Sequence, residues 1–186
     1  SCYNTVLDMC TGTGAIAISV AHYTKAKVTA SDISSKALEV ARENAKILNA
    51  DVNFIESDLF ENINETFDVL VSNPPYIESE VIPTLMEQVK DYEPMLALDG
   101  GKDGLDFYRN IINQAKNYIN QNGCIVFEIG YNQGGQVKNL LENAGFVNIN
   151  IKQDLAGLDR LVIGFKLWYT DHIRTGGKKC LKDLQI

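Results

Sequence analysis

The chain has 186 residues, 45% of them hydrophobic and 22% charged, a composition that suits one globular domain. Its net charge of −7 disfavours a nucleic-acid substrate, because enzymes that bind a duplex usually turn a basic face toward the phosphates. No apolar run approaches the roughly 18 residues that a membrane span needs. Residues 1–8 lack the basic and apolar regions of a secretory signal, and the chain opens almost directly on a strand, as a fragment cut at a domain boundary would. We expect a cytoplasmic monomer, without a membrane or a stable nucleic acid as partner.

Short apolar runs alternate with longer helical patterns, which predicts an α/β sandwich. Strands are expected, in chain order, at residues 6–9, 27–30, 52–55, 67–71, 124–129, 146–151 and 160–165. Helices are expected at residues 14–23, 34–48, 103–120 and 133–144, with Ser34 and Asp103 as caps and Gly145 as a stop. Residues 78–89 are typical of a loop with a helical turn. The last two strands leave no room for a helix between them, so we expect an antiparallel hairpin at the sheet edge.

A glycine-rich turn follows the first predicted strand. Thr11-Gly12-Thr13-Gly14 lies between that strand and a helix, where glycine lets a ligand approach the backbone and the helix N-terminus offers unpaired amides. Asp32 ends the second predicted strand, where a carboxylate can accept both ribose hydroxyls of an adenosine. Together they predict a nucleoside site, but they do not distinguish a nicotinamide cofactor from S-adenosylmethionine.

The third predicted strand is followed by Ser57-Asp58-Leu59. In an open α/β sheet, ligands gather outside the carboxyl ends of the strands. Asp58 is placed to bond an adenine amino group, with Leu59 against the ring. The sequence has no metal-binding pattern, because its cysteines are scattered and its histidines are isolated. The cysteines are Cys2, Cys10, Cys124 and Cys180, and the histidines are His22 and His172. We therefore expect no metal and reduced thiols.

Asn73-Pro74-Pro75-Tyr76, here called the tetrapeptide, ends the fourth predicted strand. The prolines stiffen the turn and remove two backbone donors, which leaves the Pro74 carbonyl as an acceptor beside the Asn73 side chain. Two such acceptors can hold the N–H groups of an amide or aromatic amine, and Tyr76 offers a ring for stacking. Because that nitrogen is a weak nucleophile, aligning it with a methyl sulfonium is catalysis by orientation and electrostatics. We therefore expect Asn73, Pro74, Pro75 and Tyr76 to be the catalytic residues.

At these motifs the sequence resembles the catalytic domain of the HemK/PrmC release-factor glutamine methyltransferases. The first motif lies at residues 6–17, the substrate motif at 72–77, and further similar stretches at 92–94, 97–105, 127–130 and 154–160. The tetrapeptide alone is shared with DNA and RNA amino-methyltransferases. Its combination with Glu93-Pro94 and the Gly100-Gly101 loop is much more specific, and the resemblance covers residues 5–167.

The resemblance implies the α/β Rossmann-like fold of class I S-adenosylmethionine-dependent methyltransferases, with a seven-stranded, mostly parallel sheet and an antiparallel last strand. It implies that Asn73 and Pro74 grip a glutamine side chain in the Gly-Gly-Gln loop of a peptide chain release factor, with Tyr76 beside it. The cofactor would be S-adenosylmethionine and its product S-adenosylhomocysteine. The residues expected to bind it are Asp8, Thr11, Gly12, Gly14, Asp32, Ile33, Asp58, Leu59 and Asn73.

The sequence departs from the family's pattern at several points. Cys10 stands where the family usually has Gly, and Leu158 stands where a polar or basic residue is common. The family's N-terminal helical domain, which helps to recognise the release factor, is absent from this sequence. We expect residues 1–168 to form the catalytic domain and residues 169–186 to form a C-terminal tail of unknown role.

The residues alone leave other functions open. An amino-methyltransferase acting on adenine or cytosine would share the tetrapeptide, but it predicts a basic face or a target-recognition insert. A nicotinamide-dependent oxidoreductase would use the glycine loop and Asp32 and leave the tetrapeptide without a role. A non-catalytic binding module would keep the fold without turnover. Protein-glutamine methylation accounts for most of the features and is the leading hypothesis.

Overall fold

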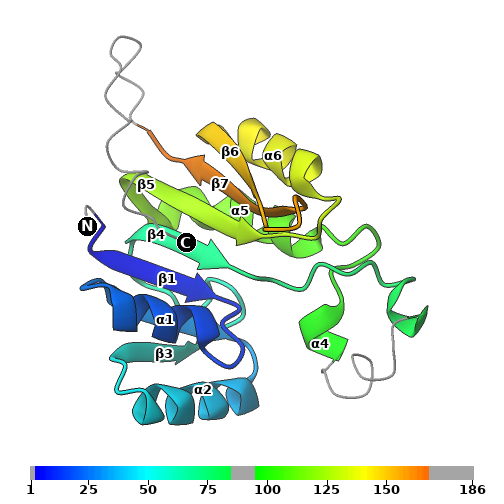
Figure 1. Cartoon of the computed structure of the whole chain (residues 1–186). Helices are drawn as coiled ribbons and strands as arrows, with labels where there is room; N and C mark the ends of the chain where they lie inside the picture. Colours follow the sequence, from blue (N-terminus) through cyan, green and yellow to red (C-terminus); the bar gives the residue numbers. More distant parts are fainter. Residues whose placement is uncertain (1–2, 85–94, 168–186) are drawn as a thin grey trace.

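The computed structural model describes residues 3–84 and 95–167, whose strands form one sheet (Figure 1). The strands are β1 Thr5–Met9, β2 Lys27–Asp32, β3 Val52–Glu56, β4 Phe67–Ser72, β5 Ile119–Glu128, β6 Val147–Gln153 and β7 Asp159–Phe165. Their order is β3-β2-β1-β4-β5-β7-β6. Pairing is parallel from β3 to β5, and β7 is antiparallel to both β5 and β6. The predicted seven-stranded sheet with a reversed last strand, and the hairpin at its edge, are confirmed.

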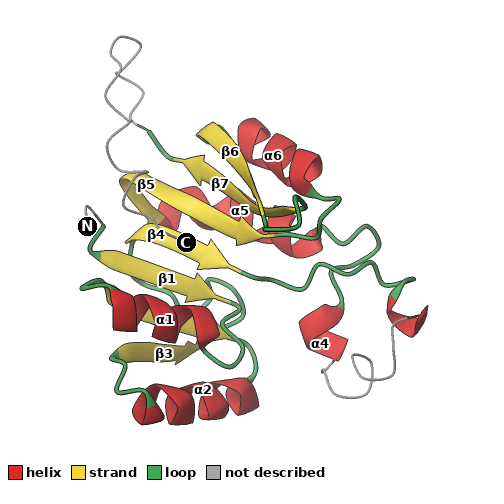
Figure 2. Ribbon diagram, in the orientation of Figure 1, coloured by secondary structure: helices red, strands yellow, loops and turns green. Residues whose placement is uncertain are grey.

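Helices cover both faces of the sheet (Figure 2). Those on the faces are α1 Ala15–Tyr23, α2 Ser35–Ile47, α5 Asp106–Tyr118 and α6 Gly134–Asn143. The short helix α4 Met95–Leu98 and a 3-10 helix at Ile82–Thr84 lie in the connection between β4 and α5. One core packs Ala17 of α1 against Val6 and Val28 of the sheet. The larger core lies on the opposite face, where α5 and α6 cover Leu7 and Phe127. Within the described residues, no helix combines the length and apolar character that crossing a membrane requires.

Most predicted boundaries agree with the structure to within a few residues. Ser34 caps α2 as predicted, because its side chain accepts a hydrogen bond from the Ala37 amide at 3.2 Å. Gly145 follows α6 with a φ of 74°, which is the left-handed stop that the sequence predicts. The predicted loop at 78–89 contains the 3-10 helix. Its residues after 84, the 92–94 motif and the 169–186 tail lie outside the described residues, as do Cys2, Cys180 and His172.

The start of α5 differs from the prediction. The helix begins at Asp106 behind the N-cap Leu105, and no side chain caps it. Gly104 has a φ of 69°, so the chain turns in the left-handed region between Asp103 and the helix. The Asp103 carboxylate forms an ion pair with Arg109 and accepts the Leu105 amide at 3.3 Å. The prediction of Asp103 as the cap is wrong, because the glycine turn displaces it from the cap position and Arg109 binds its carboxylate.

The strand predicted at 124–129 is also longer than the apolar pattern indicates. α5 ends at Tyr118, before the predicted 120, and β5 begins at Ile119. The register shifts between Phe67, which pairs with Ile119, and Val69, which pairs with Cys124. Residues 120–123 at this bulge are three polar side chains and a glycine, so hydrophobic periodicity does not mark them as strand.

Asp68 of β4 anchors the beginning of β1 to the sheet. One carboxylate oxygen accepts the backbone amides of Asn4 at 2.7 Å and Thr5 at 3.2 Å, and the other accepts the Asn120 side chain at 2.8 Å. Burial alone would raise the pKa of Asp68, but these hydrogen bonds outweigh burial and lower it. The ionised carboxylate is therefore the form that holds the beginnings of β1, β4 and β5 together.

Replacing Asp68 with Ala is expected to lower the free energy of unfolding by about 1–3 kcal/mol at neutral pH, because two backbone amides lose their acceptor. A group with a depressed folded-state pKa contributes stability above its unfolded pKa and loses it as pH falls through the folded pKa. The deficit of Asp68→Ala should therefore shrink below about pH 4. Urea titrations at neutral pH and below about pH 4 measure this difference in unfolding free energy, with Asp51→Ala, at an exposed site, as control. A deficit independent of pH would contradict the assignment.

Candidate active site

The carboxyl ends of β1, β2, β3 and β4 lie level with one another at one edge of the sheet (Figure 1). Met9 pairs with Ser31 on one side and with Ser72 on the other. The Ser72 hydroxyl donates to the Met9 carbonyl at 2.7 Å, which ties β4 to β1. The loops after these strands therefore begin side by side. Asp32 is the last residue of β2, and the loops carry the other predicted site residues at this edge, which are Thr11, Gly12, Gly14, Ile33, Asp58, Leu59 and Asn73.

Asp32 holds the glycine loop (residues 11–14) through its carboxylate. One oxygen accepts the Gly12 amide at 2.8 Å, and the other accepts the Ser34 amide at 2.9 Å. The Thr11 amide donates to the Ser31 carbonyl at 3.0 Å, which fixes the loop to the end of β2. Each carboxylate oxygen has a second lone pair, so Asp32 retains the capacity to accept a ligand hydroxyl.

The glycine loop presents an open side at Gly12 and a packed side at Gly14. Both residues have left-handed φ angles, of 56° and 83°. A Cβ on Gly12 would meet nothing within 4 Å, whereas one on Gly14 would lie 3.1 Å from side-chain atoms of Ala41 and Ile18. Gly14 thus lets α2 approach the start of α1, and Gly12 leaves room for a ligand. α1 begins without a side-chain cap, as expected for a helix end that binds a ligand.

Asp8 lies beneath the glycine loop and is fully buried. Its Oδ2 accepts the Thr11 hydroxyl at 2.5 Å and the Ala17 amide at 2.9 Å, so it links the loop to the first turn of α1. Its Oδ1 is buried without a hydrogen-bond partner among the described residues. Burial raises the pKa of Asp8 to about 7, and the hydrogen bonds from Thr11 and Ala17 only partly oppose that rise. Asp8 is predicted to bind the cofactor, and its position beneath the loop favours an indirect contribution.

Cys10 occupies the first position after β1 with a left-handed φ of 60°. Burial, together with the nearby carboxylates of Asp32, Asp8 and Asp58, raises the pKa of its thiol to about 12. The thiol therefore stays protonated at neutral pH and is a weak nucleophile. The exposed carboxylate of Asp58 is therefore close enough to Cys10 to affect its thiol. Leu59, which has a φ of 47°, is partly buried against the larger core.

The tetrapeptide leaves β4 at the same edge of the sheet. Asn73 is exposed, Pro74 is buried, and Tyr76 packs against the larger core. The next residue, Ile77, forms a bridge with Asp99 from the loop before α5. The Ile77 amide donates to the Leu98 carbonyl at 3.0 Å, and the Gly100 amide donates to the Ile77 carbonyl at 2.8 Å. The loop at residues 99–105 therefore supports the tetrapeptide from one side.

Gln133 is a site residue that sequence analysis identified only as the start of a helix. Its side chain is buried and donates to the Tyr76 carbonyl at 3.0 Å and the Gly104 carbonyl at 3.1 Å. Its carbonyl oxygen accepts the Gly130 amide at 2.9 Å. A polar residue just before a helix usually caps that helix, so the sequence offered no signal for a contact with a residue 57 positions away.

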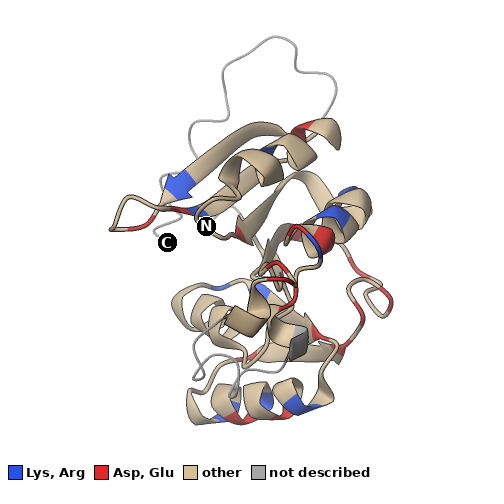
Figure 3. Cartoon of the chain, turned by 90° about the vertical axis from the view of Figure 1, so that its right-hand side faces the viewer, with Lys and Arg blue, Asp and Glu red and all other residues tan. Residues whose placement is uncertain are grey.

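Acidic side chains dominate the loops of this edge, which faces the viewer in Figure 3. In the described loops at residues 57–66, 73–81 and 99–105, the acids are Asp58, Glu61, Glu65, Glu78, Glu80, Asp99 and Asp103. The same segments contain a single basic residue, Lys102. A phosphate backbone would be repelled by such a surface, whereas a cationic ligand would be attracted.

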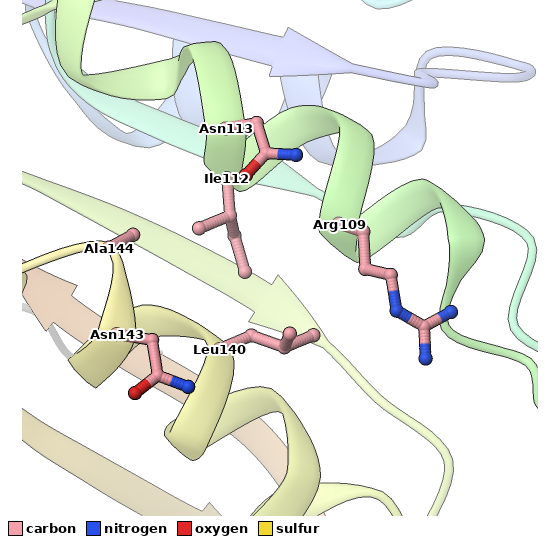
Figure 4. A pocket seen from close by; sticks show the side chains of 6 residues that line it. All are labelled: Arg109, Ile112, Asn113, Leu140, Asn143 and Ala144. Carbon is pink, nitrogen blue, oxygen red and sulfur yellow. The ribbon is translucent and has the colours of Figure 1, made fainter.

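A pocket lies elsewhere, between α5 and α6 (Figure 4). It has a volume of about 280 Å³ and is lined by Arg109, Ile112, Asn113, Leu140, Asn143 and Ala144. Ile112 and Leu140 extend into the space between the two helices, and Arg109 extends away from Asn143. The pocket shares no residue with the predicted site. We place the candidate site at the carboxyl edge, because the polar groups and the open glycine converge there.

The sheet order, the single reversed strand and the glycine loop at the carboxyl edge define a class I methyltransferase fold. A methyltransferase from Pyrococcus furiosus has this fold, with a TM-score of 0.70 and 21% identity over 88% of this chain and 75% of that one. Ribosomal protein L11 methylase from Lactobacillus delbrueckii subsp. bulgaricus superposes with a TM-score of 0.62 and 25% identity, over 87% of this chain and 69% of that one.

Residues 2–100 match the family described as methyltransferase small domain, and the chain belongs to that family. Among its relatives, the release factor glutamine methyltransferase of Clostridium acetobutylicum is 46% identical over 88% of this chain and 60% of its own length. The enzyme of the same name from Fusobacterium nucleatum is 46% identical over 87% of this chain and 47% of its own length. The chain thus spans about half to three fifths of these relatives.

The carboxyl edge fits S-adenosylmethionine, the methyl donor of this class. Gly12 leaves open space beside the loop, and the Asp32 carboxylate lies next to it with lone pairs to spare. The carboxylates of Asp32 and Asp58 near Cys10 give the edge a negative potential that favours a sulfonium cation. The open side of Gly12 and the nearby carboxylates are therefore compatible with that group.

Asp8→Asn is expected to change the pH dependence of stability. Because the folded-state pKa of Asp8 lies near 7 and its ordinary value is 3.8, stability from the protonated form is present at low pH and is lost as pH rises toward 7. Asn cannot ionise, so the melting temperature of Asp8→Asn relative to wild type should rise between about pH 4 and pH 7. Melting curves across that range measure this difference in melting temperature, in which the contributions of the other acidic residues cancel. A constant difference would show that Asp8 titrates normally.

Proposed function

We propose that the chain transfers a methyl group from S-adenosylmethionine to the side-chain amide nitrogen of the glutamine in the Gly-Gly-Gln loop of a peptide chain release factor. The observation that carries this proposal is the contact of Ser72 with Met9, which sets the tetrapeptide beside the glycine loop. A methyl donor and a planar nitrogen must meet at such a junction. The names of the relatives from Clostridium acetobutylicum and Fusobacterium nucleatum agree with this substrate.

In this proposal the tetrapeptide binds the reacting amide. The Asn73 side-chain oxygen and the Pro74 carbonyl accept the two N–H groups of the glutamine, and Tyr76 packs beside its plane. Holding both hydrogens fixes the direction of the nitrogen and increases its electron density. When bound, the cofactor would supply an electrophilic methyl carbon with the sulfur as leaving group, and the glutamine nitrogen held by Asn73 and Pro74 would accept that methyl group and release one proton to solvent.

The loops of β1, β2 and β3 would hold the cofactor, which supplies an electrophilic methyl group on a sulfonium. Asp32 would accept ribose hydroxyls, and Gly12 and Gly14 would allow close approach of the backbone. Asp8 and Thr11 would maintain the loop through their hydrogen bond. Further contacts are proposed for Ile33, which is 48% exposed beside Asp32, and for Asp58, Leu59 and Asn73.

The remaining assignments follow from the same proposal. We place the boundary of the catalytic domain near residue 168, which is supported by the end of β7 at Phe165. A cytoplasmic location is supported by the free thiols of Cys10 and Cys124 among the described residues. The acidic loops disfavour stable nucleic-acid binding. We propose a monomer, with the release factor as the macromolecular partner.

The direct test is to incubate the chain with S-adenosylmethionine and, in parallel, with a purified release factor or a short DNA duplex. Mass spectrometry of the products should find one added methyl group on the glutamine of the Gly-Gly-Gln loop and none on the DNA. Methylated DNA would support an amino-methyltransferase of adenine or cytosine instead. If neither is methylated, repeating the assay with the N-terminal domain of a relative fused to the chain decides whether recognition is what the chain lacks.

Asn73→Ala should reduce methyl transfer by at least about a hundredfold, because an acceptor of the reacting amide is lost. Asn73 is exposed at the end of β4, so the substitution should not disturb the core. Initial rates and the dissociation constant of S-adenosylhomocysteine should be measured together, with Asn53→Ala, at an exposed position of β3, as control. Transfer near the wild-type rate would exclude the proposed role.

Asp32→Asn should weaken S-adenosylmethionine binding by about 1–3 kcal/mol, because a ribose hydroxyl loses a charged acceptor. Asn is preferred to Ala here, since it retains one oxygen for the Gly12 amide and limits disturbance of the loop. Calorimetric titration of the variant and of Asp51→Asn, an exposed control, measures the change. Equal affinity in all three proteins would place the ribose elsewhere.

A further inference from the structure

The Gln133 side chain joins three segments that are distant in sequence. It lies at the N-cap of α6, and only 5% of its surface is exposed. Its Nε2 donates to the carbonyls of Tyr76 and Gly104, and its Oε1 accepts the Gly130 amide. These hydrogen bonds lie between 2.9 and 3.1 Å, so each falls in the normal range. One side chain therefore connects the tetrapeptide, the 99–105 loop and the β5–α6 turn.

The set of partners requires a neutral primary amide. Two carbonyls need two donors and one amide needs an acceptor, which is what a glutamine side chain provides. A carboxylate at this position would direct an oxygen at the two carbonyls, and an aliphatic side chain would remove both donors and the acceptor from this contact. The arrangement also determines which end of the amide is nitrogen, because the reverse orientation would pair oxygen with oxygen.

Two glycines let this side chain and the 99–105 loop reach the tetrapeptide. A Cβ on Gly104 would collide with the Tyr76 carbonyl oxygen and lie 2.7 Å from Gln133 Nε2. A Cβ on Gly100 would lie 2.7 Å from Tyr76 Cα and 2.9 Å from the Pro75 carbonyl oxygen. The backbone of the tetrapeptide is thus in direct contact with the 99–105 loop, at the point where Gln133 binds both.

We propose that Gln133 is a positioning residue for methyl transfer, acting through the Tyr76 carbonyl on the tetrapeptide. Prolines at 74 and 75 fix their own φ angles, so few backbone rotations separate the Tyr76 carbonyl from Pro74 and Asn73. Holding that carbonyl therefore restricts the direction in which the Pro74 carbonyl and the Asn73 side chain face. Gln133 contacts neither substrate nor cofactor in this role. The inference rests on the proposed function of the tetrapeptide.

The test compares Gln133→Glu with Gln136→Glu, a matched change at an exposed position one turn further along α6. Gln133→Glu keeps the shape of the side chain and removes the two donors. With a Gly-Gly-Gln release factor as substrate, its kcat should fall by about tenfold to a hundredfold. Its KM and the dissociation constant of S-adenosylhomocysteine should stay within about twofold, because the cofactor loops are untouched. Gln136→Glu should match wild type in all three quantities.

The pH profile adds a second readout. Protonation of the new carboxyl restores one donor, so the kcat of Gln133→Glu relative to wild type should rise as pH falls. An unchanged kcat, or cofactor affinity lost in parallel with kcat, would overturn the proposal, since the second result indicates general disruption of the fold.

Amide hydrogen exchange tests, independently of turnover, whether Gln133 orders the tetrapeptide segment. The amides of Ile77 and Gly100 are bonded across the contact between the tetrapeptide segment and the 99–105 loop. In Gln133→Leu they should exchange at least about tenfold faster, whereas the amides of β1 should keep their wild-type rates. Unchanged exchange at Ile77 would overturn the claim that Gln133 holds this segment. If wild type transfers no methyl group, the proposed function fails by itself, and exchange at Ile77 still decides whether Gln133 orders this segment.

Discussion

The parallel pairing of β1 with β2 on one side and with β4 on the other determines where the chemistry can occur. Met9 aligns with both Ser31 and Ser72, so three strands end at the same level. The loops that follow these strands therefore start at the same level and lie close to one another. Ser72 reinforces the junction by donating to the Met9 carbonyl. A register shift of one residue in either pair would turn the buried side chains outward and separate the glycine loop from the tetrapeptide.

Negative charge is distributed unevenly around that junction. Asp8 is buried under the glycine loop, where burial favours its protonated form, and Asp32 and Asp58 stand closer to solvent. The separation allows carboxylates to hold the loop while keeping a negative potential where a sulfonium would bind. It also explains why Cys10 is tolerated between β1 and the glycine loop, because its thiol stays protonated there and packs against the core as a small apolar group.

Local patterns predicted the elements well and predicted their long-range contacts poorly. The alternation of apolar runs identified every strand of the sheet, and the lack of space for a helix identified the reversed hairpin. Asp103 was misassigned because a left-handed glycine and a partner arginine, neither of them a local capping signal, decide its contacts. The polar start of β5 was missed because a bulge needs no hydrophobic side chains. Gln133 was missed because its partners come together only in the folded sheet.

The central claim is that cofactor and reacting amide meet at the carboxyl edge formed by β1, β2, β3 and β4. A crystal structure of the chain with S-adenosylhomocysteine and a Gly-Gly-Gln peptide tests this claim most directly. We predict that the nucleoside contacts Gly12 and Asp32 and that the glutamine amide is bonded to Asn73 and Pro74. Binding of the nucleoside in the pocket between α5 and α6, or of the glutamine away from the tetrapeptide, would contradict this claim.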